Sequence, residues 1–203
     1  RVLPSDVIGR IAAGEVVERP AAVVKELLEN SLDAGSSSIT VEIKDGGLGL
    51  IRVSDDGEGM SRGDASLAFE RHATSKLQSD QQLGAVRTMG FRGEALPSIA
   101  AVSKIRLTTV ARNDHVGAQL WLTGGTITRV EDAAAIPGTS IEVSELFFNT
   151  PARRKFLKST TTEFSHISHV VQQAALAWPQ VYMRLVHNGY EVFALPAVSS
   201  PRD

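Results

Sequence analysis

The sequence lacks cysteine, a long apolar run and a strong excess of charge of either sign. Without cysteine the chain has neither disulfides nor thiolate metal sites, which suits the cytosol. No apolar run is long enough to span a bilayer, and the first ten residues lack the apolar segment of a secretory signal. The formal net charge is -2. Any surface that attracts nucleic acid or an anionic membrane must therefore be local.

What the sequence does contain is the composition of a globular protein, with 42% hydrophobic and 22% charged residues in 203 positions. This length is enough for one substantial core, so we expect residues 1–203 to form a single domain. The chain begins without methionine and stops after the loop-like SSPRD. We therefore expect it to be a piece of a longer protein.

The stretch Val23 to Gly35, VVKELLENSLDAG, has the periodicity of a helix with two different faces. The core-facing side is expected to carry Val24, Leu27, Leu28, Ser31 and Leu32. Glu26, Asn30 and Asp33 fall within a narrow arc on the other side. Glu26 and Asn30 are one turn apart, so a carboxylate able to take a proton from water lies beside a neutral oxygen ligand for a hard cation such as magnesium. By itself, such a polar face is more often simply solvated.

Alternating apolar residues, separated by glycine-containing turns, predict strands that look antiparallel. The predicted strands cover residues 39–43, 50–53, 104–110, 118–122, 126–130, 139–143, 182–186 and 191–195. Apolar residues at helical spacing predict further helices over residues 4–13, 63–72, 94–102 and 162–177.

The acidic loop SDDGEGM, residues 54–60, follows the second predicted strand directly. Its glycines let the backbone turn sharply and approach a ligand closely. Asp55 is an acceptor-only carboxylate that can take a hydrogen bond from the exocyclic amine of adenine. The alternative is an ordinary acidic turn. A calcium loop is not favoured, because the terminal glutamate is missing at the required spacing.

Two glycines bracket Arg92 in the sequence GFRGE, just before the helix predicted over residues 94–102. Backbone N–H groups at such a helix start are suited to phosphate, and Lys76 in the polar run Thr74-Ser75-Lys76 could add charge. The spacing matches neither the Walker pattern nor the dinucleotide fingerprint.

Basic residues gather at Arg153, Arg154 and Lys155, either as a DNA-facing surface or as a solvated helix start. His166 and His169 lie three apart on the last predicted helix and could bind a metal. No third ligand is evident, so we expect both to be surface residues.

Four segments taken together resemble the N-terminal ATPase region of the MutL family of DNA mismatch-repair proteins. This family belongs to the GHKL group, with type II topoisomerase ATPase subunits, histidine kinases and a heat-shock chaperone. The segments are IAAGEVVERPAAVVKELLENSLDAG, SDDGEGM, RHATSKL with MGFRGEAL, and FFNTPARRKFL. The acidic and glycine elements are shared across the group. AAGEVVERP, GFRGEAL and NTPARRKFL are specific to the MutL branch, and the likeness covers nearly the whole chain.

The resemblance implies a magnesium-dependent ATPase in which Glu26 is the general base that activates water and Asn30 holds Mg²⁺ against the phosphates of ATP. It implies that Asp55 binds the adenine amine and that Gly57 and Gly59 shape the pocket. The other nucleotide-binding residues it implies are Ala34, the lid residues Thr74, Ser75, Lys76, Gly90, Phe91, Arg92, Gly93, Glu94, Ala95 and Leu96 over the phosphates, and Thr139 at the adenine end.

The fold that the resemblance implies is α+β, a two-layer α/β sandwich of the GHKL (Bergerat) type. A mixed, largely antiparallel sheet is covered on one face by helices, with ATP held between the layers. In this family ATP orders the lid and the N-terminal segment, two such domains form a homodimer, and hydrolysis resets them.

The partners implied are a MutS-type mismatch-recognition protein, a downstream nicking endonuclease and helicase, and DNA, contacted weakly through Arg153, Arg154 and Lys155. No membrane is involved. The location implied is the cytoplasm near the nucleoid if the source is bacterial, and the nucleus if it is eukaryotic.

One departure from the family concerns hydrolysis. In the family a second subdomain, beyond the end of this chain, supplies a lysine to the γ-phosphate, and the C-terminal dimerisation region is also missing here. We therefore expect weak or no turnover by this chain alone. The alternatives are a nucleotide-binding scaffold without turnover and a GHKL ATPase of another branch, such as a topoisomerase subunit, against which NTPARRKFL argues.

Overall fold

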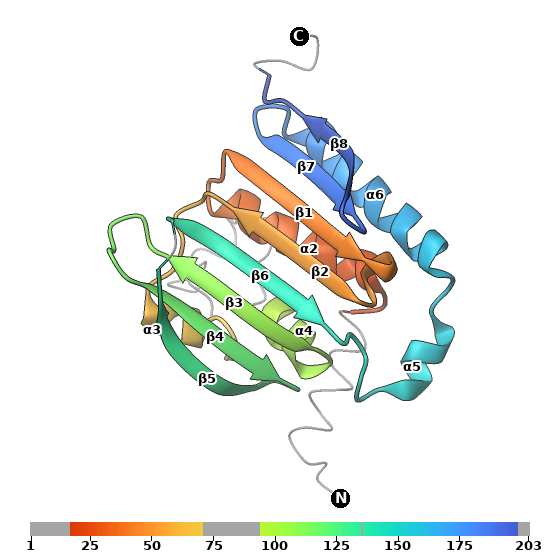
Figure 1. The fold of residues 1–203 in the computed structure, drawn as a ribbon, viewed down its shortest axis with the longest axis horizontal. Helices are drawn as coiled ribbons and strands as arrows, with labels where there is room; N and C mark the ends of the chain where they lie inside the picture. The colour runs from red at the N-terminus through yellow and green to blue at the C-terminus, as the bar shows by residue number, and fades with distance from the viewer. Residues whose placement is uncertain (1–16, 71–93, 135, 199–203) are drawn as a thin grey trace, which may run out of the picture.

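An eight-stranded sheet forms the centre of the described structure (Figure 1). The structure is a computed structural model that describes residues 17–70, 94–134 and 136–198. The strands are β1 (Ser38–Lys44), β2 (Leu50–Asp55), β3 (Lys104–Val110), β4 (Gly117–Thr123), β5 (Thr126–Ala133), β6 (Gly138–Ser144), β7 (Tyr182–His187) and β8 (Tyr190–Leu195). Their order is β5-β4-β3-β6-β2-β1-β7-β8. Among these described strands only β1 and β7 pair in parallel, so the predicted mixed, largely antiparallel sheet is confirmed.

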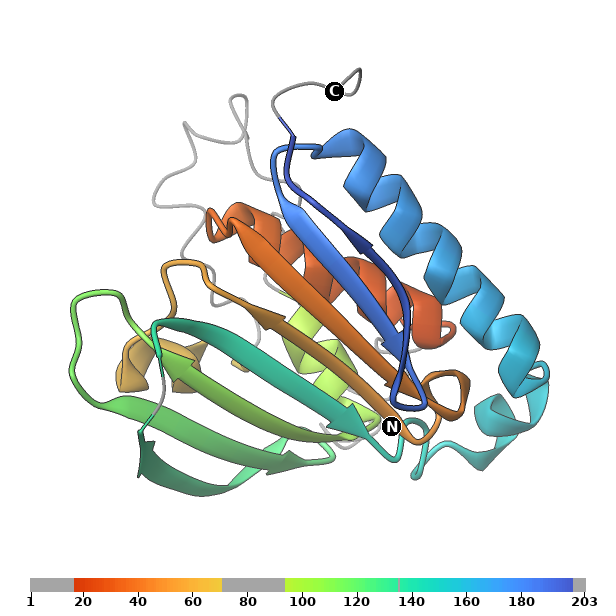
Figure 2. The same ribbon diagram turned by 45° about the horizontal axis from the view of Figure 1, so that its top comes forward.

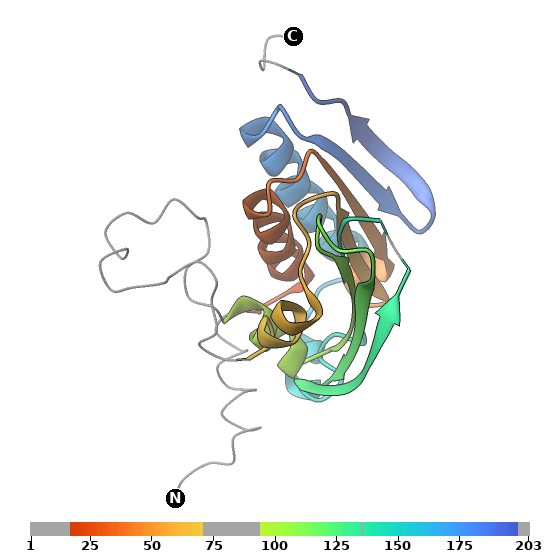
Figure 3. The ribbon, with the colours of Figure 1, turned by 90° about the vertical axis from the view of Figure 1, so that its left-hand side faces the viewer.

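The described helices lie on one side of this sheet, which gives the predicted two-layer α+β architecture (Figure 3). They are α2 (Pro20–Asp33), α3 (Arg62–Leu67), α4 (Ala95–Ala101), α5 (Pro151–Phe156) and α6 (Thr160–Ala177), with a short 3-10 turn η1 (Asp45–Gly47). Helices α2 and α6 pack side by side (Figures 1 and 2). None of the described helices combines the length and the apolar character needed to cross a membrane. The helix expected over residues 4–13 lies outside the described residues.

The core forms between the apolar face of α2 and the helix-facing side of the sheet. Val24, Leu27 and Leu28 of α2 are at most 2% exposed, as are Ile39 and Val41 of β1. Burying each such side chain stabilises the fold by about 1.5–3 kcal/mol. Side chains repeat in direction every 3.6 residues in α2 and every two in β1, and these periods therefore determine which face of each element packs into the core. The same packing leaves Glu26 and Asn30 on the half-buried polar side of α2.

Several elements differ in extent from their prediction: α2 begins at Pro20, α3 ends at Leu67 rather than at position 72, and β5 continues to Ala133. For two others the structure shows the reason. Strand β2 continues to Asp55, because it pairs with β6 up to Thr139. The predicted strand ended at position 53 and placed Asp55 in the loop. Helix α6 begins two residues earlier than predicted, because Ser159 caps it: the Ser159 hydroxyl accepts a hydrogen bond from Thr162 N–H at 3.2 Å.

Candidate functional site

The polar face of α2 presents Glu26 and Asn30 one helical turn apart, both half-buried. Both residues interact with neighbouring groups. Ala34 ends the helix, and its N–H donates to the carbonyl oxygen of Asn30 at 3.0 Å. The predicted spacing of Glu26, Asn30 and Ala34 on one helix is therefore present. A carboxylate for proton transfer and an amide oxygen for a hard cation lie on one face.

Asp55 is fixed by two donors at the last position of β2. Its Oδ2 accepts from the Ser31 hydroxyl at 2.7 Å, and its Oδ1 accepts from Gly57 N–H at 3.0 Å. Burial raises the pKa of Asp55, and the hydrogen bonds from Ser31 and Gly57 offset only part of that effect. The result is an oriented, partly desolvated acceptor, which suits recognition of an amine hydrogen on a flat base.

Ser31 is a site residue that the sequence analysis placed only on the core side of the helix. It is 4% exposed, and its hydroxyl reaches across to Asp55 from the residue next to Asn30. Ser36 holds the same region by donating to the carbonyl oxygen of Ser31 at 2.5 Å. The sequence signal for this role was the hydroxyl of Ser31 within the apolar stripe of the helix, because a buried polar group needs a hydrogen-bond partner. The partner itself lies 24 residues away.

The loop after β2 is pressed against both α2 and β3. A Cβ at Gly57 would lie 2.8 Å from the Cβ of Ala34. Glu58 N–H donates to the Ala34 carbonyl oxygen at 3.0 Å. Gly59 has φ +67°, and a Cβ there would lie 1.9 Å from the Val110 carbonyl oxygen. Both positions therefore require glycine, and the loop brings Gly57 and Ala34 into contact beside Asp55.

Thr139 of β6 lies opposite Asp55 in the strand register. Its neighbour Thr109 donates its only hydroxyl hydrogen to the Gly138 carbonyl oxygen at 3.0 Å and accepts from Met60 N–H at 2.9 Å. The Thr139 hydroxyl, 3.0 Å from that of Thr109, must therefore be the donor between the two. Thr139 consequently keeps lone pairs available to accept from an outside donor.

Asp56 anchors the segment after α2 to the end of β2. Its carboxylate accepts from the backbone N–H groups of Ser37 and Ser38 at 2.7 and 2.8 Å and from the Ser37 hydroxyl. Burial acts to raise the pKa of Asp56, but these hydrogen bonds outweigh it, so the pKa lies below its ordinary value. Asp56 therefore fixes the connection while Asp55 faces the site.

The expected lid is only partly within the described residues. Glu94 is the N-cap of α4, and Ala95 and Leu96 form its first turn, on the same side of the sheet as α2 (Figure 3). Thr74, Ser75, Lys76, Gly90, Phe91, Arg92 and Gly93 lie outside the described residues. The contacts above join Asp55 and Gly57 to α2 through Ser31 and Ala34, whereas Thr139 is paired with Asp55 and Gly59 lies against Val110 of β3.

The basic residues of α5 divide into two kinds. Arg153 is half-buried; its Nη1 donates to the Val17 carbonyl oxygen at 2.7 Å, and its guanidinium lies 5.9 Å from the centre of the Phe147 ring. Arg154 and Lys155 are exposed. The three predicted DNA contacts are therefore not equivalent, because Arg153 is engaged with Val17 and Phe147 whereas Arg154 and Lys155 are exposed to solvent.

His166 and His169 are exposed on α6, as expected. Among the described residues there is no group of three or more side chains able to hold a metal ion by themselves.

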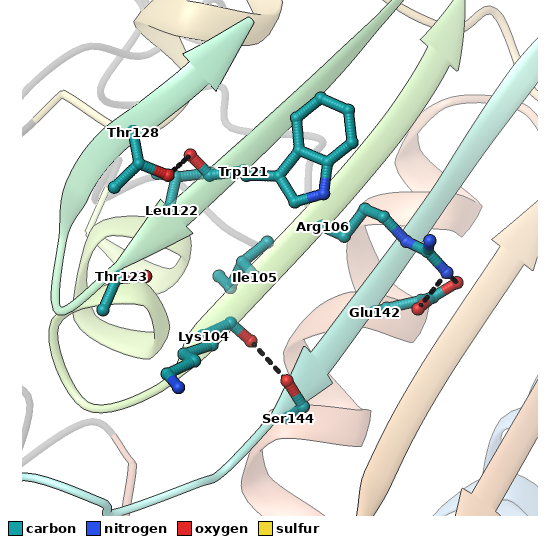
Figure 4. Close-up of a pocket in the computed structure, with 9 residues that line it drawn as sticks. All are labelled: Lys104, Ile105, Arg106, Trp121, Leu122, Thr123, Thr128, Glu142 and Ser144. Carbon is teal, nitrogen blue, oxygen red and sulfur yellow. Dashed lines mark hydrogen bonds and ion pairs between the residues drawn. The ribbon is translucent and has the colours of Figure 1, made fainter.

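A pocket of about 320 Å³ lies on the helix-free face of the sheet (Figure 4). Arg106 and Glu142 line it and alternate along their strands with buried Leu107 and Val143, so they point away from the helices. Arg106 Nη2 lies 2.6 and 2.7 Å from the two Glu142 oxygens. Because these charges are already paired, the pocket adds no chemistry to the site.

Comparison with known proteins gives one family and a consistent set of relatives. Residues 18–148 match the family described as histidine kinase-, DNA gyrase B-, and HSP90-like ATPase. The chain is 52% identical over all 203 residues to the DNA mismatch repair protein MutL of Acidobacterium capsulatum, covering 30% of that protein. It is 56% identical over 199 residues, 98% of the chain, to MutL of Koribacter versatilis, covering 31% of that protein. The chain thus spans about a third of these relatives.

Solved structures agree in fold. The ATPase domain of Aquifex aeolicus MutL in complex with ADP has a TM-score of 0.72 and 34% identity, over 91% of this chain and 66% of that one. The N-terminal domain of a DNA repair protein has a TM-score of 0.80 and 28% identity, over 96% of this chain and 58% of that one.

Proposed function

We propose that this chain, which belongs to the histidine kinase-, DNA gyrase B- and HSP90-like ATPases and is a MutL-type ATPase domain, binds ATP with Mg²⁺ between α2 and the loop after β2. The observation that carries the proposal is that Ser31 and Gly57 each donate a hydrogen bond to the Asp55 carboxylate. Ser31 belongs to α2, the helix that bears Glu26 and Asn30. The ADP complex of the Aquifex aeolicus relative supports a nucleotide as the ligand.

In the proposed complex the adenine amine donates to Asp55. The base lies beside the close contact between Gly57 and Ala34. Gly59 holds the loop in place, and Thr139 accepts a hydrogen bond from the base or from a water molecule beside it. Because Ser31 and Gly57 fix both carboxylate oxygens, little rotational freedom is lost on binding.

The residues present fit a magnesium ion that is held mainly by nucleotide. Mg²⁺ prefers oxygen ligands and commonly takes one or two from protein, with the rest from phosphates and water. The Asn30 amide oxygen is such a ligand, and a purely protein-bound site is absent from the described residues. When bound, the ion neutralises charge on the phosphates. Glu26 accepts the proton of the attacking water, and α2 holds both residues in fixed register.

The lid roles of Glu94, Ala95 and Leu96 follow from their place at the start of α4 and from the resemblance. Those of residues 74–76 and 90–93 rest on the resemblance alone. We infer that residues 1–203 belong to one domain, because a single apolar core runs from Val17 to Leu185 in the described part of the chain.

For the longer protein we propose that ATP acts as a conformational and dimerisation switch in mismatch repair, coupled to a MutS-type protein, a nicking endonuclease and a helicase. The proposal rests on the MutL identity of the relatives. DNA would be contacted weakly through Arg154 and Lys155, which are exposed on α5. The bacterial relatives favour the cytoplasm, near the nucleoid, as its location.

Calorimetric titration with a non-hydrolysable ATP analogue, with and without Mg²⁺, tests the site. We expect saturable binding that Mg²⁺ strengthens and that Asp55→Asn weakens about tenfold or more, because the lost acceptor is charged and partly desolvated. The matched control is Asp132→Asn, which removes the same charge from an exposed strand position bound to Arg62. It should bind as the unchanged chain does.

Comparison of ATP with GTP analogues separates base recognition from general damage. Asp55→Asn should reduce the preference for adenine, whereas equal loss for both bases would remove the assignment of Asp55. If a chain shown to be folded does not bind the analogue, the proposal that these residues alone bind nucleotide is rejected.

A further inference from the structure

The start of α2 is held in a buried junction that lies away from the nucleotide site. Val17, three residues before the helix, is 0% exposed, and Arg19 is the N-cap residue but makes no side-chain cap. Pro20 opens the helix against η1 and α6. A Cβ built on Gly47 would lie 2.6 Å from Pro20 Cβ and 3.2 Å from Ile167 Cδ1. The entry to α2 is therefore set by tertiary contacts rather than by a local cap.

Glu163 is the charged residue at the centre of this junction. It is 0% exposed in the first turn of α6, and its Oε1 accepts from Lys158 N–H at 2.9 Å. Its Oε2 lies 3.9 Å from Arg19 Nε and has no hydrogen-bond partner among the described residues. An acidic group buried so fully needs compensation, and Arg19 supplies the nearby positive charge.

A second contact holds the same segment from the other side. Arg153 of α5 donates to the Val17 carbonyl oxygen at 2.7 Å. The segment preceding α2 is thus tied to α5 through Val17 and to α6 through Arg19. Neither contact involves β2, which carries Asp55.

We propose that Glu163 is a positioning residue for catalysis, which acts through Arg19 to fix the axial position and rotation of α2. The proposal rests on the proposed function, in which α2 carries the general base Glu26 and the magnesium ligand Asn30. Arg19 and Glu26 are seven residues apart, about 10 Å along a rigid helix. A shift at the first turn therefore moves the reactive groups by a similar amount. Ser31 and Ala34 move with α2, but Asp55 sits on β2 and keeps its bond from Gly57 N–H, so adenine capture depends less on this junction than Glu26 and Asn30 do.

The test uses Glu163→Gln, Arg19→Gln, Arg19→Lys and the double variant with Gln at both positions. Glutamine at 163 keeps an oxygen for Lys158 N–H but removes the charge that faces Arg19. The measurements are ADP affinity without Mg²⁺, the gain in ATP-analogue affinity on adding Mg²⁺, and phosphate release by a chain extended through the region that follows residue 203. Arg184→Gln is the matched control, since it removes an exposed ion pair with Glu191 between β7 and β8.

We expect Glu163→Gln and Arg19→Gln each to lower the Mg²⁺-dependent gain and the hydrolysis rate by about fivefold or more, as small misplacements of reacting groups do. The double variant should be no worse than either single one, because both remove one interaction. Arg19→Lys, which keeps the charge, and Arg184→Gln should stay within about twofold of the unchanged chain. In Glu163→Gln and Arg19→Gln, ADP affinity without Mg²⁺ should fall by less than the Mg²⁺-dependent gain does.

A merely structural role predicts a different pattern. Folded Glu163→Gln and Arg19→Gln with an unchanged Mg²⁺-dependent gain and rate would overturn the proposal, even if their melting temperatures fall. Additive effects of the two substitutions would also overturn it. If the unchanged chain shows no Mg²⁺-dependent gain, or if Glu26→Ala hydrolyses normally, the proposed function itself fails, and this result is distinct from a failure confined to Glu163.

Discussion

At the scale of single residues, Glu26, Asn30 and Ser31 have different proposed roles although they lie close together on one helix. Glu26 and Asn30 share the half-buried polar face, whereas Ser31 points to the sheet and orients Asp55 at 2.7 Å. The helical period alone separates them: positions 26 and 30 differ in direction by only about 40°, and position 31 is turned by about a further 100°. In the proposed complex, one rigid helix therefore relates Asp55, which would bind the base, to Glu26 and Asn30, which would act at the phosphates.

Substitution of Glu26 and Asn30 should separate binding from turnover. We expect Glu26→Ala to bind the ATP analogue within about threefold of the unchanged chain, because no ligand contact is lost, while the extended chain loses hydrolysis by about a hundredfold or more. Asn30→Ala should instead lose the Mg²⁺-dependent gain in affinity. Phosphate release and calorimetry measure the two effects.

Glu29→Ala is the control for these variants, because Glu29 lies on the same helix and faces Lys25 at 3.5 Å. It should leave binding and turnover unchanged. Hydrolysis by Glu26→Ala at the normal rate would remove Glu26 as the general base, and full Mg²⁺ dependence in Asn30→Ala would remove the metal assignment.

At the scale of elements, the site depends on how the end of α2 is joined to the end of β2. The Asp56 carboxylate accepts hydrogen bonds from the backbone N–H groups of Ser37 and Ser38 in the connecting segment. Glu58 N–H donates to the Ala34 carbonyl oxygen. These contacts fix the loop from both sides. The loop can then hold Asp55 and Gly57 in place before any ligand arrives, which lowers the entropy lost on binding.

Asp56→Asn should destabilise the chain in a pH-dependent way. Because hydrogen bonds lower the pKa of Asp56 in the folded state, its contribution is present above the ordinary value of 3.8 and is lost as the pH falls through the folded-state pKa. We expect the variant to lose on the order of 1 kcal/mol at neutral pH, as for a weakened charged hydrogen bond, with the difference narrowing below about pH 4.

Urea unfolding of the two chains at a series of pH values measures this difference. Asp114→Asn, an exposed carboxylate in a turn, should show little change at any pH. A loss of stability for Asp56→Asn that grows on acidification would contradict the assigned direction of the pKa shift.

At the scale of the whole molecule, basic side chains on the helix-free face of the sheet lie beside acidic ones, whereas the sequence around α5 is basic. On the helix-free face of the sheet, Arg52 lies between Glu42 and Glu142, and Lys104 contacts Glu145. The segment 146–162, which contains α5, has no acidic residue. Arg154 and Lys155 are exposed within this segment, so they offer a local positive surface in a chain whose net charge is -2.

The double variant Arg154→Gln/Lys155→Gln should weaken DNA binding by the longer protein without lowering its stability. If each residue neutralises one phosphate of duplex DNA, the slope of log affinity against log salt should fall in magnitude by about 2. Arg153→Gln should do the reverse, lowering the melting temperature because it removes the bond to Val17. Anisotropy titrations at several salt concentrations, beside thermal melts, test both. An unchanged salt slope would place the DNA contact elsewhere.

The sequence by itself determined what short-range periodicity encodes. Alternation predicted the strands to within a few residues, and the apolar stripe of α2 predicted Val24, Leu27 and Leu28 as core and Glu26 and Asn30 as a pair. These inferences hold because side-chain direction in a helix or strand depends only on local backbone geometry. The end of β2 was misplaced because its last pair depends on a distant strand.

Tertiary structure alone decided which distant groups meet. The parallel pairing of β1 with β7, the bond from Ser31 to Asp55, the place of Thr139 opposite Asp55 and the approach of Arg19 to Glu163 all join positions far apart in sequence. No local pattern marks such pairs, because each depends on how whole helices and strands pack against one another. The sequence thus determined which residues α2 offers for chemistry, and packing decided what orients them.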